Sequence, residues 1–236
     1  MTTLPADHFD ADSTTDEVLD GLDLNGRNVV ITGTSSGLGI ETARALSARG
    51  AHVVGVVRNI DKARAALAAA GASEVDLYEA DLASLESVRA FTDRYVADGH
   101  DRIDVLIANA GIMACPQGST TDGFELQFGT NHLGHFLLIN RLLPLLLNAK
   151  AARVVMLSSS GHRFGDVSLD DPNFERTPYD AWMAYGRAKT ANVLFAVELD
   201  RRYRSEGPRA TAGPPAGIGT AAGRPGSEET TNAAAR

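Results

Sequence analysis

The chain has 236 residues, a length that suits one α/β domain and leaves no room for two large ones. Its formal net charge of −8, with 22% charged and 44% hydrophobic residues, is typical of a globular protein and argues against binding to nucleic acid or to anionic membranes. The single cysteine, Cys115, excludes an intrachain disulfide and is compatible with the reducing cytoplasm, where we expect the protein to reside.

Residues 1–26 form a polar, acidic lead-in that lacks the basic start and the apolar centre of a signal peptide. The most apolar stretch, residues 136–147, is interrupted by Asn140, Arg141 and Pro144 and is too short to span a bilayer. We therefore expect a buried helix there, bent near Pro144, and no membrane partner.

From residue 27 to residue 212, short β-branched runs alternate with longer helical patterns. The expected strands are residues 28–32, 52–57, 74–80, 103–108, 153–157 and a sixth that begins at 209–212. The expected helices are residues 37–49, 61–70, 85–96, 131–147 and 182–203. This alternation indicates a parallel sheet covered by helices on both faces. Right-handed crossovers then give a doubly wound, Rossmann-type α/β fold with three α/β/α layers in a single domain.

The final segment, residues 213–236, is rich in Gly, Ala, Pro, Thr and Ser, and Ile218 is its only large apolar residue. Such a segment buries too little surface to offset the entropy of ordering it, so we expect it to be disordered. The sixth strand is then expected to lie at an open edge of the sheet.

A glycine-rich turn follows the first expected strand and leads into the first long helix. Its residues after Thr32 are Gly33, Thr34, Ser35, Ser36, Gly37, Leu38 and Gly39. Glycines permit a close approach of the backbone to a pyrophosphate, the helix N-terminus supplies N–H groups, and the hydroxyls add donors. The glycine spacing differs from Gly-x-Gly-x-x-Gly, and a plain loop is the alternative. The position after the first strand favours a dinucleotide site.

Arg58 stands at the end of the second expected strand, where NAD-selective sites usually place an acidic residue. A guanidinium at this point can pair with a 2′-phosphate, although a solvated surface arginine is the alternative. We therefore expect NADP(H) to be preferred over NAD(H).

Tyr185 and Lys189 are four residues apart in an expected helix and so share one face of it. A nearby ammonium favours the phenolate and should lower the pKa of Tyr185, which would suit acid–base chemistry on an alcohol/carbonyl pair. Ser159 follows the fifth strand and can donate to the same substrate oxygen. A Tyr-x-x-x-Lys pair alone is a weak signal, because chance surface pairs are common.

Several further motifs accompany this pair in a specific order. They are TGTSSGLG (32–39), VVRN (56–59), ADL (80–82), NAG (109–111), TNHLGHF (130–136), MLSSSGHRF (156–164) and MAYGRAK (183–189). With them the sequence resembles the short-chain dehydrogenase/reductase superfamily, and within it the retinol-dehydrogenase-like branch that includes WW-domain-containing oxidoreductases. The resemblance covers residues 26–212.

The resemblance implies transfer of a hydride between NADP(H) and an alcohol/carbonyl pair on a lipophilic small molecule. Tyr185 would be the proton donor or acceptor, and Lys189 would lower its pKa and hold the nicotinamide ribose. Ser159, rather than a neighbouring serine, would polarise the substrate oxygen. Asn131 would anchor a water relay to Lys189.

The resemblance also assigns the remaining cofactor contacts. Asp81 and Leu82 would border the adenine, and Asn109, Ala110 and Gly111 would border the adenosine ribose. A homo-oligomer could form through the long helices.

Other residues admit more than one interpretation. His132 and His135 could suggest a metal site, but no third ligand is apparent in the sequence, so we expect no metal. Trp182 could line a substrate pocket or serve packing.

The end of the chain departs from the family pattern, because residues 212–217 read AGPPAG where relatives have an apolar residue and a Pro-Gly turn. Residues 213–236 then stand where a substrate lid is expected, so the C-terminal part looks missing or degraded. A catalytically impaired nucleotide-binding protein is therefore the second interpretation. A sugar-nucleotide epimerase is a third, disfavoured by the glycine spacing.

Overall fold

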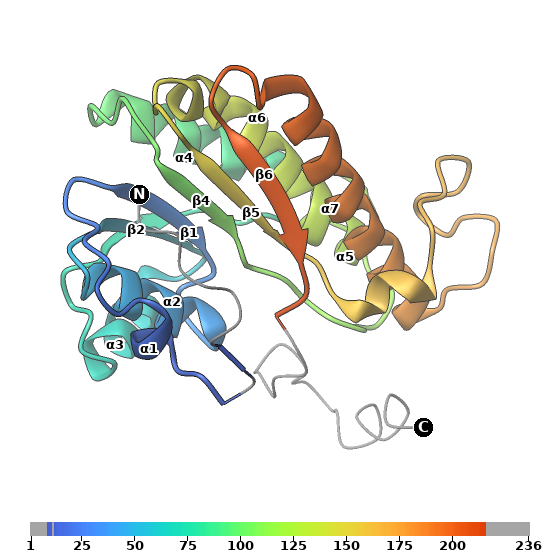
Figure 1. Cartoon of the computed structure of the whole chain (residues 1–236). Coiled ribbons are helices and arrows are strands. Elements are labelled where there is room, and N and C mark those ends of the chain that lie inside the picture. The colour runs from blue at the N-terminus through green and yellow to red at the C-terminus, as the bar shows by residue number, and fades with distance from the viewer. Residues whose placement is uncertain (1–8, 11, 216–236) are drawn as a thin grey trace.

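A six-stranded parallel sheet in the order β3-β2-β1-β4-β5-β6 forms the middle of the structure (Figure 1). The computed structural model describes residues 9–10 and 12–215. The strands are β1 (Asn28–Thr32), β2 (His52–Val57), β3 (Asp76–Glu79), β4 (Val105–Ala108), β5 (Arg153–Leu157) and β6 (Arg209–Gly213). Every neighbouring pair is parallel, which confirms the doubly wound, Rossmann-type α/β fold expected from the sequence.

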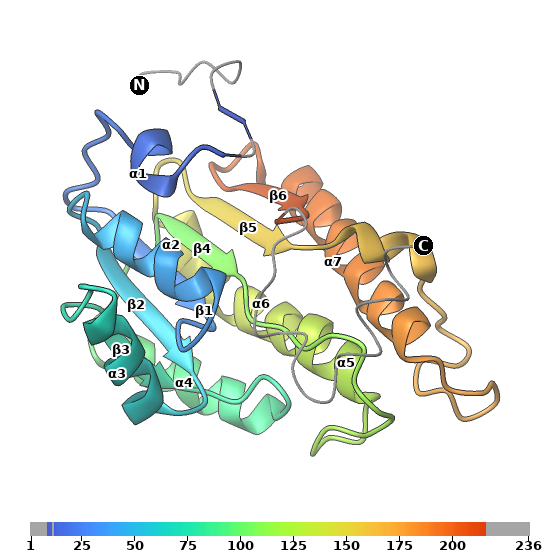
Figure 2. The same cartoon turned by 90° about the horizontal axis from the view of Figure 1, so that it is seen from below.

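Helices connect the strands and cover both faces of the sheet. The longer helices are α2 (Leu38–Ser47), α3 (Ile60–Ala69), α4 (Leu85–Ala97), α6 (Gly134–Leu147) and α7 (Ala181–Tyr203). The shorter elements are α1 (Thr15–Val18), α5 (Leu126–Phe128), the π-helical turn η2 (Gly129–Leu133) and the 3₁₀ turn η3 (Ser160–Phe164). Figure 2 shows α3 beside β3 and α7 beside β6, at opposite ends of the sheet.

The core consists of two apolar layers, one on each face of the sheet. Successive residues of a strand point to opposite faces, so Val29 and Ile31 of β1 pack toward α2 and α3, while Val30 packs toward α4, α6 and α7. Both faces are therefore buried, which explains why the strands read as nearly continuous apolar runs.

The observed ends of several elements differ from the predicted ends. The fourth strand was expected from residue 103 but begins at Val105, because the Ile103 N–H donates to the Leu145 carbonyl of α6. The helix expected from residue 131 begins as the π-helical turn η2 and becomes α-helical at Gly134. The fifth strand has the predicted bounds.

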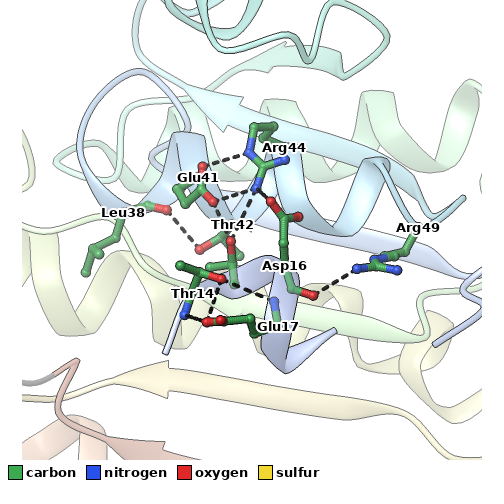
Figure 3. A network of polar contacts seen from close by, with 9 residues as sticks. Thr14, Asp16, Glu17, Leu38, Glu41, Thr42, Arg44 and Arg49 are labelled. Atoms are coloured by element: carbon green, nitrogen blue, oxygen red, sulfur yellow. Dashed lines mark hydrogen bonds and ion pairs between the residues drawn. The ribbon is translucent and has the colours of Figure 1, made fainter. Parts of the chain in front are cut away.

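The acidic lead-in contains a short helix, α1, that the sequence did not predict. Thr14 and Glu17 form a capping box at its start. Arg44 of α2 pairs with Asp16 at 3.0 Å, and Arg49 donates to the Asp16 carbonyl oxygen at 2.8 Å. These contacts hold α1 against α2 (Figure 3).

The predicted disordered tail, residues 213–236, lies outside the described residues from residue 216 onward. Its first residue, Gly213, ends β6, and the Gly213 carbonyl accepts the N–H of Ser158 at 3.0 Å. Within the described part of the chain, β6 pairs with β5 and forms an edge of the sheet. None of the helices in the described part is long and apolar enough to cross a membrane.

Candidate active site

The candidate site lies at the carboxyl ends of the strands, where the strand order reverses between β1 and β4. In doubly wound sheets this crevice is where ligands bind. The glycine turn follows β1, the segment 109–111 follows β4, and Ser159 follows β5. The fold thus brings the predicted cofactor turn and the predicted catalytic residues together at the carboxyl ends of the strands.

The glycine turn forms a cradle that side chains would fill. Gly33 has φ +81°, and a Cβ atom there would lie 2.9 Å from the Cα atom of Ala110. A Cβ atom on Gly39 would collide with the Gly33 carbonyl and approach Asn109 Nδ2 to 2.7 Å. Gly37 is the N-cap of α2, and no side chain of the described residues caps this helix. The turn therefore fits a pyrophosphate held by backbone N–H groups.

Thr34 departs from the expected role of a phosphate donor. Its side chain is fully buried, and its hydroxyl lies where a Cβ atom on Gly55 of β2 would stand. This hydroxyl has no hydrogen-bond partner among the described residues. The tertiary contact with β2 therefore turns Thr34 away from the role expected of it, whereas Ser35 is half-buried and Ser36 exposed.

The predicted adenine side of the site is formed by the neighbouring ends of β2 and β3. Val57 pairs with Glu79, so that Arg58 and Asp81 follow adjacent strands. Arg58 is exposed, Leu82 is buried, and Asp81 accepts the N–H of Ala83 at 3.0 Å. The Arg58 side chain is exposed at this end of β2, and its pairing with a 2′-phosphate stays a prediction.

The segment after β4 lies against both the glycine turn and the predicted catalytic lysine. Asn109 Nδ2 donates to the Thr32 carbonyl at 2.8 Å. A Cβ atom on Gly111 would lie 3.2 Å from Asn131 Oδ1 and 3.7 Å from Lys189 Nζ. Gly111 therefore allows the backbone to pass close to both polar side chains.

The environments of the serines after β5 favour Ser159 as the residue facing the site. Ser158 is buried, and its hydroxyl donates to the Lys189 carbonyl at 2.9 Å, whereas Ser160 is exposed. A Cβ atom on Gly161 would lie 2.9 Å from Tyr185 Cε1 and 3.3 Å from Ser159 Oγ. The Tyr185 ring and the Ser159 hydroxyl thus meet at Gly161.

The pKa of Tyr185 is shifted in the direction opposite to the one expected from its pairing with Lys189. Burial raises the pKa of the phenol, and the hydroxyl of Ser159 lowers it in part. Lys189 Nζ lies 5.5 Å from the centroid of the Tyr185 ring. Desolvation therefore outweighs the Ser159 hydrogen bond, and Tyr185 is protonated at neutral pH.

Lys189 is itself almost fully buried on α7. Its ammonium donates to the Leu157 carbonyl at the end of β5, at 2.9 Å. Burial lowers the pKa of Lys189 from 10.5 to about 8. The lysine therefore carries a positive charge at neutral pH but lies near its titration range.

Asn131 lies in η2 and is fully buried. Its side-chain amide binds Ile112 on both sides, because Oδ1 accepts the Ile112 N–H and Nδ2 donates to the Ile112 carbonyl, each at 2.8 Å. Asn131 thus fixes the loop that contains Gly111, a role that the sequence did not predict. The water relay expected from Asn131 to Lys189 stays a prediction.

The histidines of the TNHLGHF motif have protein partners. His132 Nδ1 lies 3.0 Å from Asn192 Oδ1, and His135 lies between Thr32 and the Asn131 carbonyl. His135, which the sequence suggested only as a possible metal ligand, is thus a buried residue with two polar contacts. The signal was its place in the motif, four residues after Asn131 and so one helical turn away.

The strand order and the glycine turn define a Rossmann-type α/β protein, and comparisons with known proteins identify its family. A family model described as short chain dehydrogenase matches residues 27–230. Retinol dehydrogenase 14 of Homo sapiens is 45% identical over 198 residues, which cover 76% of this chain and 58% of that protein. Retinol dehydrogenase 13 of Homo sapiens is 41% identical over 186 residues, which cover 77% of this chain and 56% of that protein.

Two solved structures agree with this result. An uncharacterised protein of Mycobacterium paratuberculosis matches with a TM-score of 0.75 and 47% identity, over 85% of this chain and 70% of that one. A short chain dehydrogenase of Shigella flexneri 2a, complexed with NADP, matches with a TM-score of 0.68 and 27% identity, over 84% of this chain and 80% of that one.

The chain belongs to the short-chain dehydrogenase/reductase family, a family of NAD(P)-dependent oxidoreductases, and to its retinol-dehydrogenase-like branch. This confirms the resemblance seen in the sequence. The chain spans 58% and 56% of the lengths of the two human relatives.

The burial of Lys189 predicts a pH dependence of stability. Between a folded-state pKa of about 8 and the ordinary value of 10.5, the unfolded chain binds a proton that the folded chain has lost. The free energy of unfolding therefore gains a contribution that rises with pH, by roughly 2 kcal/mol between about pH 7.5 and about pH 9.5.

Urea unfolding of the unmodified chain and of Lys189→Met at both pH values measures this contribution. The difference in stability between the two proteins should shift in favour of the unmodified chain at the higher pH. Lys150→Met, at an exposed lysine, is the control and should leave the rise intact. A difference that is the same at both pH values would contradict the assignment.

Proposed function

We propose that this chain catalyses hydride transfer between NADP(H) and an alcohol/carbonyl pair on a lipophilic small molecule. The observation that carries the proposal is the placement of Tyr185, Ser159 and Lys189 at the carboxyl ends of the strands, where the glycine cradle also lies. Two relatives are named retinol dehydrogenases, and a matching structure was solved with NADP. These similarities to other proteins support the proposal independently of the geometry of the site.

The protonation state of Tyr185 suits proton donation to a carbonyl oxygen near neutral pH. NADPH, held by the glycine turn and Arg58, would supply the hydride when bound. Tyr185, whose pKa is raised by burial, holds the proton that its hydroxyl passes to the carbonyl oxygen. Ser159 donates a hydrogen bond to the same oxygen, and the Lys189 ammonium stabilises the phenolate that is left.

Aromatic side chains beside Tyr185 support an apolar substrate. Trp182 contacts the Tyr185 ring edge-to-face with centroids 6.3 Å apart, and it contacts Phe164 in the same manner at 5.8 Å. Phe164 is 52% exposed, which is unusual for a residue of this size. This row of rings would give a lipophilic substrate an apolar surface next to the hydroxyl of Tyr185.

Self-association through the long helices is also part of the proposal. Phe136 on α6 and Leu194 and Val197 on α7 are exposed apolar side chains. Exposed apolar groups of this size on long helices suit contact with a second copy. A cytoplasmic location is likewise part of the proposal.

Removal of the Tyr185 hydroxyl tests the proposed chemistry. Tyr185→Phe should retain less than about a hundredth of the NADPH-dependent turnover found in a screen of carbonyl substrates, because it lacks the proton donor. Its Kd for NADPH, measured by fluorescence titration, should stay within about threefold, since the hydroxyl contributes little to dinucleotide binding.

Tyr203→Phe, on the last turn of the same helix, is the control and should keep full turnover. Retained turnover in Tyr185→Phe would show that the acid is misassigned. NADPH binding without turnover in the unmodified chain would instead favour the impaired nucleotide-binding protein.

The cofactor preference depends on Arg58. The unmodified chain should bind NADPH at least about tenfold more tightly than NADH, because the guanidinium pairs with the 2′-phosphate. Arg58→Ala should reduce this ratio to about threefold or less, mainly by weakening NADPH. Arg64→Ala, at an exposed arginine of the neighbouring helix α3, should leave the ratio unchanged. Equal Kd values for both nucleotides in the unmodified chain would end the NADP assignment.

A further inference from the structure

A buried histidine connects the glycine-turn strand to the predicted catalytic asparagine. His135 is fully buried on α6. Its Nε2 atom lies 2.9 Å from the hydroxyl oxygen of Thr32, the last residue of β1, and its Nδ1 atom lies 2.9 Å from the Asn131 carbonyl oxygen. The mechanism proposed above leaves this titratable side chain without a role.

The hydrogen bonds at Thr32 determine which His135 nitrogen accepts. The Thr32 hydroxyl oxygen receives the N–H groups of Asn109 and Ala110, each at 3.0 Å. A hydroxyl has two lone pairs and one proton, so both lone pairs are used and the proton remains for His135. His135 Nε2 must therefore be the acceptor.

The bond at the other ring nitrogen leads to the same result independently. A carbonyl oxygen can only accept, so His135 Nδ1 must donate its proton to the Asn131 carbonyl. The ring is thus neutral, with its proton on Nδ1. Full burial, which lowers the pKa of His135 to about 4, agrees with a neutral ring.

We propose that His135, as the neutral Nδ1–H tautomer, is a positioning residue that holds the Asn131 carbonyl and thereby the η2 turn in place for the reaction. This inference rests on the proposed function for its catalytic consequence. The bonds run in one direction, from the N–H groups of 109 and 110 through Thr32 and His135 to the Asn131 carbonyl.

Asn192 links the Asn131 carbonyl, which His135 holds, to the carbonyl that binds the predicted catalytic lysine. The Asn131 carbonyl also accepts Asn192 Nδ2 at 3.2 Å, and the same nitrogen donates to the Leu157 carbonyl at 3.3 Å. That carbonyl holds Lys189 Nζ at 2.9 Å. Loss of the His135 donor would therefore loosen the turn that fixes the Ile112 loop and the carbonyl that orients the ammonium.

Two substitutions by amide residues test the two hydrogen bonds of the His135 ring one at a time. In His135→Asn the side-chain amide can take the place of Nδ1 and donate to Asn131, but it loses Thr32. In His135→Gln the longer amide can reach Thr32 but loses Asn131. The kcat for carbonyl reduction should stay within about threefold in His135→Asn and fall at least about tenfold in His135→Gln. The Kd for NADPH should change less than about threefold in both, because neither variant replaces a residue of the glycine turn or Arg58.

A purely structural role predicts a different result. Both variants would then lose stability and activity together, and equal losses of kcat would overturn the proposal. The tautomer can be read without any substitution, from the two-bond ¹⁵N–¹H couplings of the His135 ring in the unmodified chain by NMR. A neutral Nδ1–H ring supports the proposal, whereas an Nε2–H ring or a protonated ring at neutral pH overturns it.

The two experiments distinguish this inference from the proposed function. If the unmodified chain shows no carbonyl reduction, the proposed function fails and the NMR result alone decides the state of His135. If the variants do not fold, the NMR result again decides. If the unmodified chain is active and His135→Gln is as active as His135→Asn, the positioning role is wrong while the proposed function stands.

Discussion

The carbonyl oxygen of Asn131 is the point at which the elements of the site are tied together. It is buried in the π-helical turn η2 and accepts one hydrogen bond from His135 and one from Asn192. A buried polar group is costly unless it is paired, and networks of such bonds rigidify their surroundings. Through these donors the carbonyl is connected to β1 at Thr32 and to β5 at Leu157, the strands that precede the glycine turn and Ser159.

Close backbone contacts add to this constraint. Several positions in the site have no room for a side chain and are occupied by glycine. Gly33 and Gly39 allow the turn after β1 to lie against Asn109 and Ala110, and Gly161 allows the Tyr185 ring to lie next to Ser159. Larger residues at these points would separate the cradle from the groups that act on the substrate. The geometry of the site therefore depends on these glycines as well as on its functional side chains.

The strands could be predicted from the sequence because both faces of the sheet are buried, so that their β-branched runs are conspicuous. The predicted start of β4 was wrong, since the N–H of Ile103 bonds to the Leu145 carbonyl of α6, a contact between distant segments. The same limit applies to the site. Motif order located Ser159, Tyr185 and Lys189, but the buried Thr34 and the raised pKa of Tyr185 depend on tertiary packing that no local pattern encodes.

The central claim is that the cradle, Arg58 and the Ser159–Tyr185–Lys189 group form one site for one dinucleotide. A crystal structure of the chain with NADP⁺ bound tests it most directly. We expect the pyrophosphate over residues 33–39, the 2′-phosphate within hydrogen-bond distance of Arg58, and the nicotinamide ribose beside Tyr185 and Lys189. A nucleotide bound elsewhere, or one whose nicotinamide end points away from Tyr185, would contradict it.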